Sequence, residues 1–236
     1  MTRSFALVCW LSAVGFVIAV PLTPYHGVFA SGWEKPSDPS GDCKFVRDRV
    51  SLTIEVLGTD HDQCPARDRT NAPRLLRPVE GDFVVQVRVG GVAAPTSKSS
   101  VGDLRSFVAA GLVLETEGLT ILFVYGAEQR DGSVQRYVSW RVQNPQGGER
   151  CICSEKWTDW PLKGREKAAF LRLERRGNQL LFSLSADGEK WAKLDPLGRV
   201  LPARMKVGIL ACSTSKEAFK PRFDEFQFTG ADPKRK

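Results

Sequence analysis

Hydrophobic and polar residues alternate along most of this chain with a period of two. Residues 83–89 place four hydrophobic side chains on one face and Gln86 and Arg88 on the other, the pattern of a half-buried strand. Similar segments predict strands over 51–57, 109–115, 119–125, 134–142, 170–175, 179–185, 206–212 and 222–228. Beyond the first thirty residues, no window of a dozen residues keeps hydrophobic positions at helical spacing.

Turn residues separate these segments. Arg176-Gly177-Asn178, Ala186-Asp187-Gly188-Glu189 and Asp131-Gly132 are typical of hairpin connections, because glycine and asparagine accept a positive φ. Short strands at regular spacing favour antiparallel sheets over βαβ units. We therefore predict an all-β fold, an antiparallel two-sheet β-sandwich.

The first thirty residues have the pattern of a secretory signal peptide. Arg3 supplies a positive charge, residues 4–20 are uncharged, and Val28-Phe29-Ala30 offers small residues at the usual cleavage spacing. An uncleaved anchor is the alternative, since the stretch is about as long as the shortest membrane spans. We expect a mature chain that starts at Ser31, forms one domain over residues 31–236, is secreted or periplasmic, and has no membrane span.

Composition excludes several classes of protein. With 42% hydrophobic and 26% charged residues, the chain is neither disordered nor collagen-like nor a coiled coil. The net charge of +7 is spread without a run of like charge. No stacking aromatic stands among Arg67, Arg69, Arg74 and Arg77, and no glycine-rich phosphate loop is present, so we expect no nucleic-acid partner.

Five cysteines follow residue 30, and an odd number outside the cytoplasm leaves one thiol without an intramolecular disulfide. We predict a disulfide between Cys43 and Cys64. The pairing of Cys151, Cys153 and Cys212 stays open. Zinc would normally require two CxxC-type pairs or histidine partners, and the spacing here offers neither.

No complete catalytic signature is present. A nucleophilic triad needs a histidine base, and His61 is the only histidine after residue 30. Asp60 and Asp62 flank it, and Asn71 and Arg74 follow, so this cluster is a candidate ligand-binding site. Calcium through these carboxylates is an alternative that no loop signature supports, and we expect no cofactor. Glu80-Gly81-Asp82 is interpreted as a turn before the strand at Phe83.

Sugar-binding sites combine flat aromatic rings with hydrogen-bonding side chains. Trp157 and Trp160 are candidate platforms on the long connection 144–167. Tyr137 and Arg141 share one face of the strand 134–142 and are candidates as well. Trp140 takes the opposite face and is expected in the core.

Several motifs, in this order, resemble the DUF1349 family of the concanavalin A-like lectin/glucanase superfamily. They are Gly58-Thr59-Asp60-His61-Asp62, Asn71-Ala72-Pro73-Arg74-Leu75-Leu76-Arg77, Gly81-Asp82-Phe83, Ala110-Gly111-Leu112, Leu171-Arg172-Leu173-Glu174-Arg175-Arg176-Gly177-Asn178, Ser185-Ala186-Asp187-Gly188-Glu189-Lys190-Trp191, Lys206-Val207-Gly208 and Phe223-Asp224-Glu225-Phe226. The resemblance implies a jelly roll whose superfamily binds or cleaves glycans on a concave sheet. It transfers no catalytic residues, because the family has no established activity.

Three functional hypotheses follow. The first is a secreted, non-catalytic domain that binds carbohydrate or another extracellular ligand. The second is a glycoside hydrolase or lyase with an unrecognised carboxylate pair drawn from Asp60, Asp62, Glu115 or Asp187. The third is a structural envelope domain. The sequence gives no oligomeric state.

Overall fold

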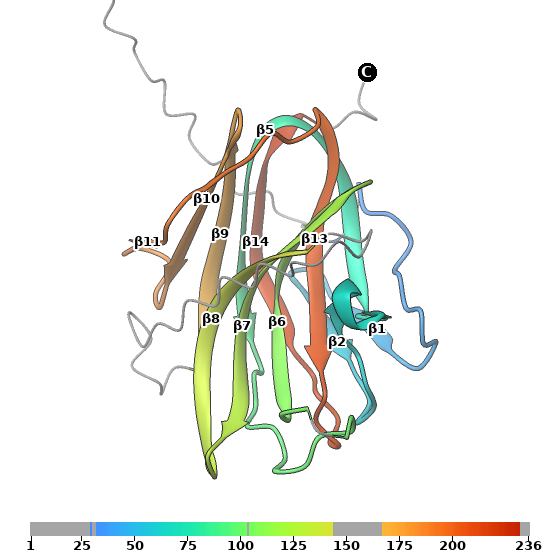
Figure 1. The fold of residues 1–236 in the computed structure, drawn as a ribbon. Coiled ribbons are helices and arrows are strands. Elements are labelled where there is room, and N and C mark those ends of the chain that lie inside the picture. Colours follow the sequence, from blue (N-terminus) through green and yellow to red (C-terminus); the bar gives the residue numbers. More distant parts are fainter. Residues whose placement is uncertain (1–28, 30–31, 103, 144–166, 232–236) are drawn as a thin grey trace, which may run out of the picture.

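The computed structural model describes residues 29, 32–102, 104–143 and 167–231, and regular structure there is almost entirely β-strand (Figure 1). The elements are β1 (Lys44–Arg47), β2 (Ser51–Glu55), β3 (Gln63–Cys64), the short 3-10 helix η1 (Pro65–Arg67), β4 (Arg69–Thr70), β5 (Arg74–Gly90), β6 (Phe107–Thr116), β7 (Leu119–Arg130), β8 (Ser133–Gln143), β9 (Ala168–Arg176), β10 (Gln179–Ser185), β11 (Ala192–Lys193), β12 (Leu197–Gly198), β13 (Arg204–Ser213) and β14 (Arg222–Ala231). No helix among the described residues is long and apolar enough to cross a membrane.

The strands form two antiparallel layers. The first layer has the order β5–β13–β6–β7–β8, and the second has the order β1–β2–β14–β5–β9–β10. Figure 1 looks onto the first layer, with β9 and β14 behind it. The predicted fold class, an all-β sandwich of antiparallel sheets, is confirmed.

Strand β5 belongs to both layers because it bends at Gly81. Residues 74–80 pair with β13, whereas residues 83–90 lie between β14 and β9. Gly81 has a φ of +71°, in the left-handed region that favours glycine. The prediction of a turn before Phe83 is therefore wrong: Glu80-Gly81-Asp82 is a bend inside a 17-residue strand.

The hydrophobic core lies between the layers. Trp140 of β8 stacks on Phe182 of β10 with 5.1 Å between ring centroids, and Phe123 of β7 meets the same ring edge-on at 5.3 Å. Leu180 and Leu184, on the same side of β10, are fully buried. Strict alternation along β8 and β10 thus delivers their hydrophobic residues to one core, as predicted for Trp140.

Candidate functional site

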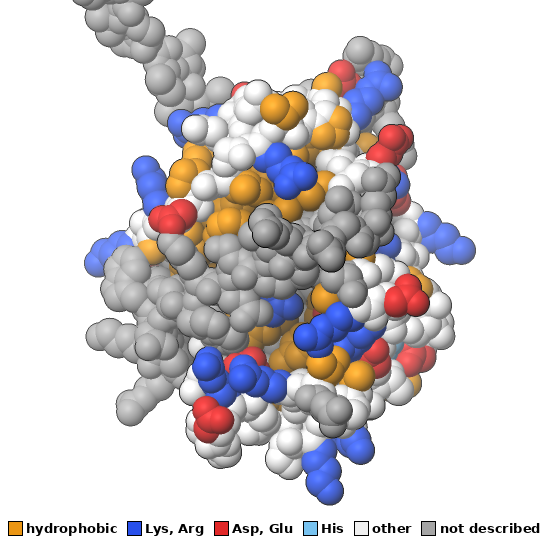
Figure 2. Space-filling model, viewed as in Figure 1, with side chains coloured by type: hydrophobic (Ala, Val, Ile, Leu, Met, Phe, Trp, Pro, Cys, Tyr) orange, Lys and Arg blue, Asp and Glu red, His pale blue; other side chains and the backbone are white. Residues whose placement is uncertain are grey.

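The face of β13–β6–β7–β8 directed away from the core is called the outer face. Along β8 it carries Tyr137, Ser139, Arg141 and Gln143, because alternate residues point to the same side. Gly126 of β7 lies opposite Tyr137, and a Cβ there would come within 2.5 Å of the tyrosine ring. The missing side chain at Gly126 lets Tyr137 lie close against the sheet. Figure 2 views this face and shows Lys and Arg side chains standing among hydrophobic ones.

A polar loop, residues 57–73, packs against the outer face. The His61 amide donates to the Ser213 carbonyl at 2.9 Å, and the Ser213 amide donates to the His61 carbonyl at 2.7 Å. The side-chain amide of Gln143 donates to the Gln63 carbonyl. These bonds tie the polar loop to β13 at one point and to β8 at another.

Within the polar loop, Asp60, Asp62 and Asn71 form one network with Arg69. Arg69 Nε donates to Asp60 Oδ2 at 2.9 Å, and Arg69 Nη1 lies 3.5 Å from Asp62 Oδ2. Asn71 accepts a bond from the Asp62 amide at 2.9 Å and donates to the Asp60 carbonyl at 2.6 Å. These carboxylates are thus held by neighbouring groups of the loop itself.

The Asp62 side chain is buried beside the outer face. Burial raises the pKa of its carboxyl, although the guanidinium groups of Arg69 and Arg141 act in the opposite direction. Burial likewise raises the pKa of the Tyr137 hydroxyl. The charge of Arg141 acts to lower that pKa, and the charge of Asp62 acts to raise it. The structure therefore brings together the predicted residues Asp60, Asp62, Asn71, Tyr137 and Arg141.

Arg74, the first residue of β5 after the polar loop, does not join Asp60, Asp62 and Tyr137. Its side chain is directed toward Glu115, which lines a cleft. Its Nε lies 2.7 Å from Glu115 Oε1. The cleft has a volume of about 410 Å³ and lies between the bend of β5, the β6–β7 turn and the start of β13. Its lining residues are Pro78, Val79, Glu115, Thr116, Glu117, Arg204, Met205 and Lys206.

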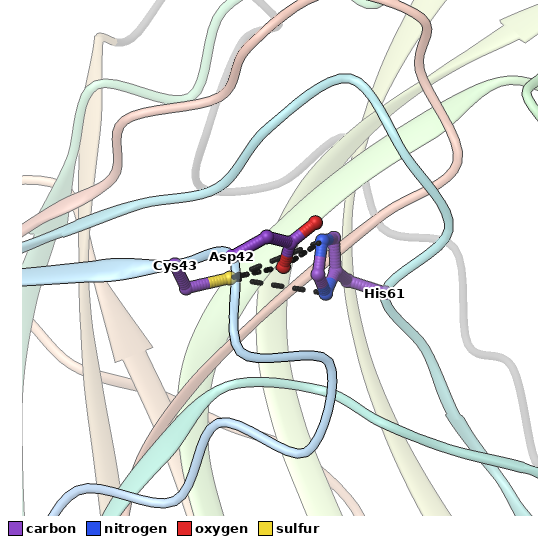
Figure 3. Close-up of side chains that lie close together, drawn as sticks. All are labelled: Asp42, Cys43 and His61. Atoms are coloured by element: carbon purple, nitrogen blue, oxygen red, sulfur yellow. Dashed lines mark hydrogen bonds and ion pairs between the residues drawn. The ribbon is translucent and has the colours of Figure 1, made fainter.

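His61 also turns away from Asp60 and Asp62. Its fully buried imidazole faces Cys43 and Asp42, with 3.8 Å between Cys43 Sγ and His61 Nδ1 and 3.3 Å between Asp42 Oδ1 and His61 Nε2 (Figure 3). The predicted Cys43–Cys64 disulfide is not formed in this structure. The reason is geometric, because the Cys43 side chain is directed at His61.

Cys43, His61 and Asp42 superficially resemble a nucleophilic triad, but the thiol is not activated. Burial raises the pKa of Cys43, and the carboxylates of Asp38 and Asp42 raise it further. A protonated thiol is a poor nucleophile. Without a bound cation, burial and the two carboxylates therefore disfavour the thiolate form of Cys43.

Asp187, a carboxylate considered for catalysis, instead holds a turn. Its Oδ1 accepts hydrogen bonds from the Glu189 amide at 2.8 Å, the Lys190 amide at 2.9 Å and the Ser185 hydroxyl at 2.9 Å. These bonds lower the pKa of the Asp187 carboxyl to about 2. This geometry supports a role in fold maintenance.

Trp157, Trp160, Cys151 and Cys153 lie outside the described residues, as does most of the predicted binding connection 144–167. Sequence reasoning overlooked Asp42 beside His61 and the polar rim of the cleft, namely Glu117, Arg204 and Lys206. The adjacent Asp42-Cys43 was the available signal for the first. For the rim no local signal exists, because long-range strand pairing brings Lys206 opposite both Glu115 and Pro78.

Several solved structures share this β-sandwich fold. A functionally unknown protein from Saccharomyces cerevisiae aligns with a TM-score of 0.60 and 19% identity, over 84% of this chain and 95% of that one. A xylan β-1,4-xylosidase from Bacillus halodurans C-125 aligns with a TM-score of 0.53 and 11% identity, over 89% of this chain and 41% of that one. The VIP36 exoplasmic/lumenal domain, in a Ca²⁺/Man3GlcNAc-bound form, aligns with a TM-score of 0.50 and 11% identity, over 85% of this chain and 84% of that one. At such identities these likenesses establish the fold alone.

The DUF1349 family model, described as a protein of unknown function, matches residues 151–231. The resemblance to this family is therefore confirmed, over a shorter part of the chain than the sequence motifs suggest. No curated protein sequence in the comparison matches the chain significantly.

Proposed function

We propose that this protein is an exported, non-catalytic domain that binds carbohydrate in the cleft between β5, β6 and β13. The observation that carries the proposal is the lining of that cleft. Pro78 supplies accessible apolar surface, backed by the buried side chains of Val79 and Met205. The hydrogen-bonding groups come from Glu115, Thr116, Glu117, Arg204 and Lys206. Sugar rings have apolar C–H faces and polar edges, so they suit such a mixed surface.

The dimensions of the cleft agree with this class of ligand. Small-molecule sites are typically about 300 to 1,000 Å³, and the cleft of about 410 Å³ falls within that range. Glu117, Arg204 and Lys206 are exposed, so their polar atoms are accessible to a ligand from solvent. Charged side chains give stronger hydrogen bonds to hydroxyl groups than neutral ones do.

A glycoside hydrolase is the second candidate, because Glu115 and Glu117 line the same cleft. Hydrolysis needs two carboxyl groups on opposite sides of one glycosidic bond, roughly 5 to 10 Å apart. Glu115 is engaged by Arg74 at 2.7 Å, and Glu117 stands in an exposed turn. Neither has the sheltered, hydrophobic surroundings that favour a general acid, so we prefer the binding function.

A glycan array probed with the purified protein tests the proposal, followed by chromatography of each bound oligosaccharide after prolonged incubation. We expect retention of at least one class of oligosaccharide and recovery of that ligand intact. Shortened products would establish the hydrolase instead. Absence of binding across the array would favour a structural envelope domain.

A further inference from the structure

Two loops meet at the open end of the β1–β2 hairpin. Asp42 and Cys43 immediately precede β1, and the chain that leaves β2 leads to His61. Antiparallel pairing of Lys44 with Glu55 brings these two segments side by side. The backbone bridge from His61 to Ser213 of β13 then fixes the histidine in place.

We propose that Asp42, Cys43 and His61 bind a zinc ion through Oδ1, Sγ and Nε2. The ligand-atom separations are 3.6 Å for Cys43 Sγ to Asp42 Oδ1, 3.3 Å for Asp42 Oδ1 to His61 Nε2, and 3.9 Å for Cys43 Sγ to His61 Nε2. Zn–S bonds of about 2.3 Å and Zn–N or Zn–O bonds of about 2.1 Å, in tetrahedral geometry, place such atoms roughly 3.4 to 3.6 Å apart. The three side chains converge in Figure 3, but Cys43 Sγ lies almost equally far from His61 Nδ1 (3.8 Å) and Nε2 (3.9 Å). Zinc binding at Nε2 therefore requires the Cys43 side chain to rotate toward that nitrogen.

Neighbouring groups orient the proposed ligands. The Thr59 hydroxyl donates to Asp42 Oδ2 at 3.0 Å and also lies 2.8 Å from His61 Nε2. It therefore borders two of the proposed ligands, and its contact with Nε2 would give way to the ion. The Cys43 amide donates to Asp38 Oδ2 at 2.8 Å and fixes the backbone of the thiol ligand. Such outer contacts are the usual means by which metal ligands are held in position.

Charge and donor type favour zinc over calcium or magnesium. The set contains one sulfur, one nitrogen and one oxygen, whereas calcium and magnesium select oxygen ligands. A thiolate and the Asp42 carboxylate together would neutralise a divalent cation, and Asp38 adds further negative charge nearby. Three protein ligands leave a fourth position for water, and the His61 ring, being fully buried, shields one side of the ion.

This assignment is independent of the proposed carbohydrate function, since the cleft residues contribute no ligand. The ion would join the segment before β1 to the polar loop and, through His61, to β13. It would therefore perform the linking role that the sequence assigned to a Cys43–Cys64 disulfide. The two arrangements exclude each other, because Cys43 cannot serve in both.

Cobalt titration of the reduced, metal-free protein tests the site, since Co²⁺ reports tetrahedral geometry and thiolate ligation by absorption. We expect one equivalent to bind with a thiolate-to-cobalt charge-transfer band, and Zn²⁺ to displace it. Cys43→Ser should abolish the band and weaken zinc binding roughly 100-fold or more. Cys64→Ser, which changes a cysteine outside the cluster, should leave both intact.

Circular dichroism of each variant establishes that it is folded, and a zinc-dependent rise in melting temperature provides a second measurement if Cys43→Ser is unstable. That rise should occur in the wild type and in Cys64→Ser. The proposal is overturned if no metal binds, if Cys43→Ser keeps the charge-transfer band, or if a non-reduced digest of the isolated protein finds Cys43 in a disulfide.

Discussion

Gly188 occupies a conformation that only glycine adopts without strain, and it also lies against an aromatic ring. Its φ is +80°, and an added Cβ would lie 3.0 to 3.3 Å from atoms of the Phe170 ring. Gly177 has a φ of +55° but no atom within 4 Å of such a Cβ. Substituting Gly177 would therefore introduce backbone strain alone, whereas substituting Gly188 would add crowding against the Phe170 ring.

Replacing each of these glycines with alanine should give unequal losses of stability. Gly177→Ala should cost about 1 to 2 kcal/mol from the left-handed backbone alone. Gly188→Ala should cost roughly 1 kcal/mol more, because Phe170 must also move. Thermal unfolding should place the melting temperature of Gly188→Ala a further 2 to 4 °C or so below that of Gly177→Ala. Equal melting temperatures would show that Phe170 yields freely.

The Asp187 carboxylate should make the turn sensitive to acid. The amides of Lys190 and Glu189 and the Ser185 hydroxyl lower the folded pKa to about 2, below the roughly 3.9 of an unfolded chain. Its stabilising effect is therefore present above about pH 4 and is lost as the pH falls toward 2. The melting-temperature advantage of the wild type over Asp187→Asn should shrink over that interval.

Asp131→Asn provides the control for this titration, because Asp131 is also a turn carboxylate but its side chain is 93% exposed. The difference in melting temperature between Asp131→Asn and the wild type should vary less with pH. A pH-independent gap for Asp187→Asn would mean that its turn is held by something other than the carboxylate.

Trp191 shows where residue-level reasoning from sequence fails. It follows the turn after β10 and packs against Phe170, with 6.5 Å between the ring centroids, and against the Arg172 guanidinium, which lies 3.8 Å from the centre of the Trp191 ring. In the pairing of β9 with β10, Phe170 lies opposite Ser185 and Arg172 lies opposite Ser183. These residues are on the side of the two strands that faces away from the core. A turn residue can fold to either face, and local sequence does not decide which.

At the scale of elements, β8 presents two chemically distinct faces. Trp140 is part of the core, whereas Tyr137 lies on the outer face over Gly126. Trp140→Ala should lower the free energy of unfolding by about 3 to 5 kcal/mol through loss of packing against Phe182. Tyr137→Phe keeps the ring and should cost no more than about 1.5 kcal/mol.

Urea unfolding of the two β8 variants measures both free energies. A larger loss for Tyr137→Phe than for Trp140→Ala would reverse the assignment of the two faces.

Alternation predicted most of the long strands because each has one face in the core. It did not predict β1, which is largely exposed, or the first half of β5, where Arg74, Arg77 and Glu80 obscure the period. Arg77 is nevertheless accommodated, with its guanidinium 4.0 Å from the centre of the Phe228 ring. The local pattern alone could not show that one strand serves two sheets.

At the scale of the whole molecule, the N-terminal region bears on both export and packing. Export and cleavage before Ser31 remain a prediction from the signal pattern. Phe29, just before the expected cleavage point, stacks on Trp33 at 5.5 Å and contacts Phe226 at 5.6 Å. Cleavage after Ala30 would remove this ring from the edge of the core.

N-terminal sequencing of exported protein should therefore find Ser31 as the first residue, and retention of Met1 would indicate an anchor. The chain starting at Ser31 should melt roughly 2 to 8 °C below one that keeps Phe29, for a loss of about 1 to 2 kcal/mol of burial. Identical melting temperatures would show that the Phe29 contacts contribute nothing.

The candidate sites also belong to this scale, because residues distant in sequence build them. The cluster around Asp60 and Asp62 was found from sequence, since its members are close along the chain. The cleft was not, because β5, β6 and β13 must pair before Pro78, Glu115 and Lys206 meet. Likewise, sequence placed His61 with its neighbours Asp60 and Asp62, whereas the fold directs it to Asp42 and Cys43.

The most direct test of the carbohydrate-binding proposal is calorimetric titration of an array-positive oligosaccharide into the wild type, Glu117→Ala and Glu217→Ala. Glu117, in the β6–β7 turn, lines the cleft, while Glu217 is an exposed carboxylate that follows the C-terminal end of β13, away from the cleft. We predict that Glu117→Ala weakens binding roughly 10-fold or more, as expected for a lost charged hydrogen bond, and that Glu217→Ala binds like the wild type. Unchanged affinity in Glu117→Ala, or equal weakening in both variants, would contradict binding in the cleft.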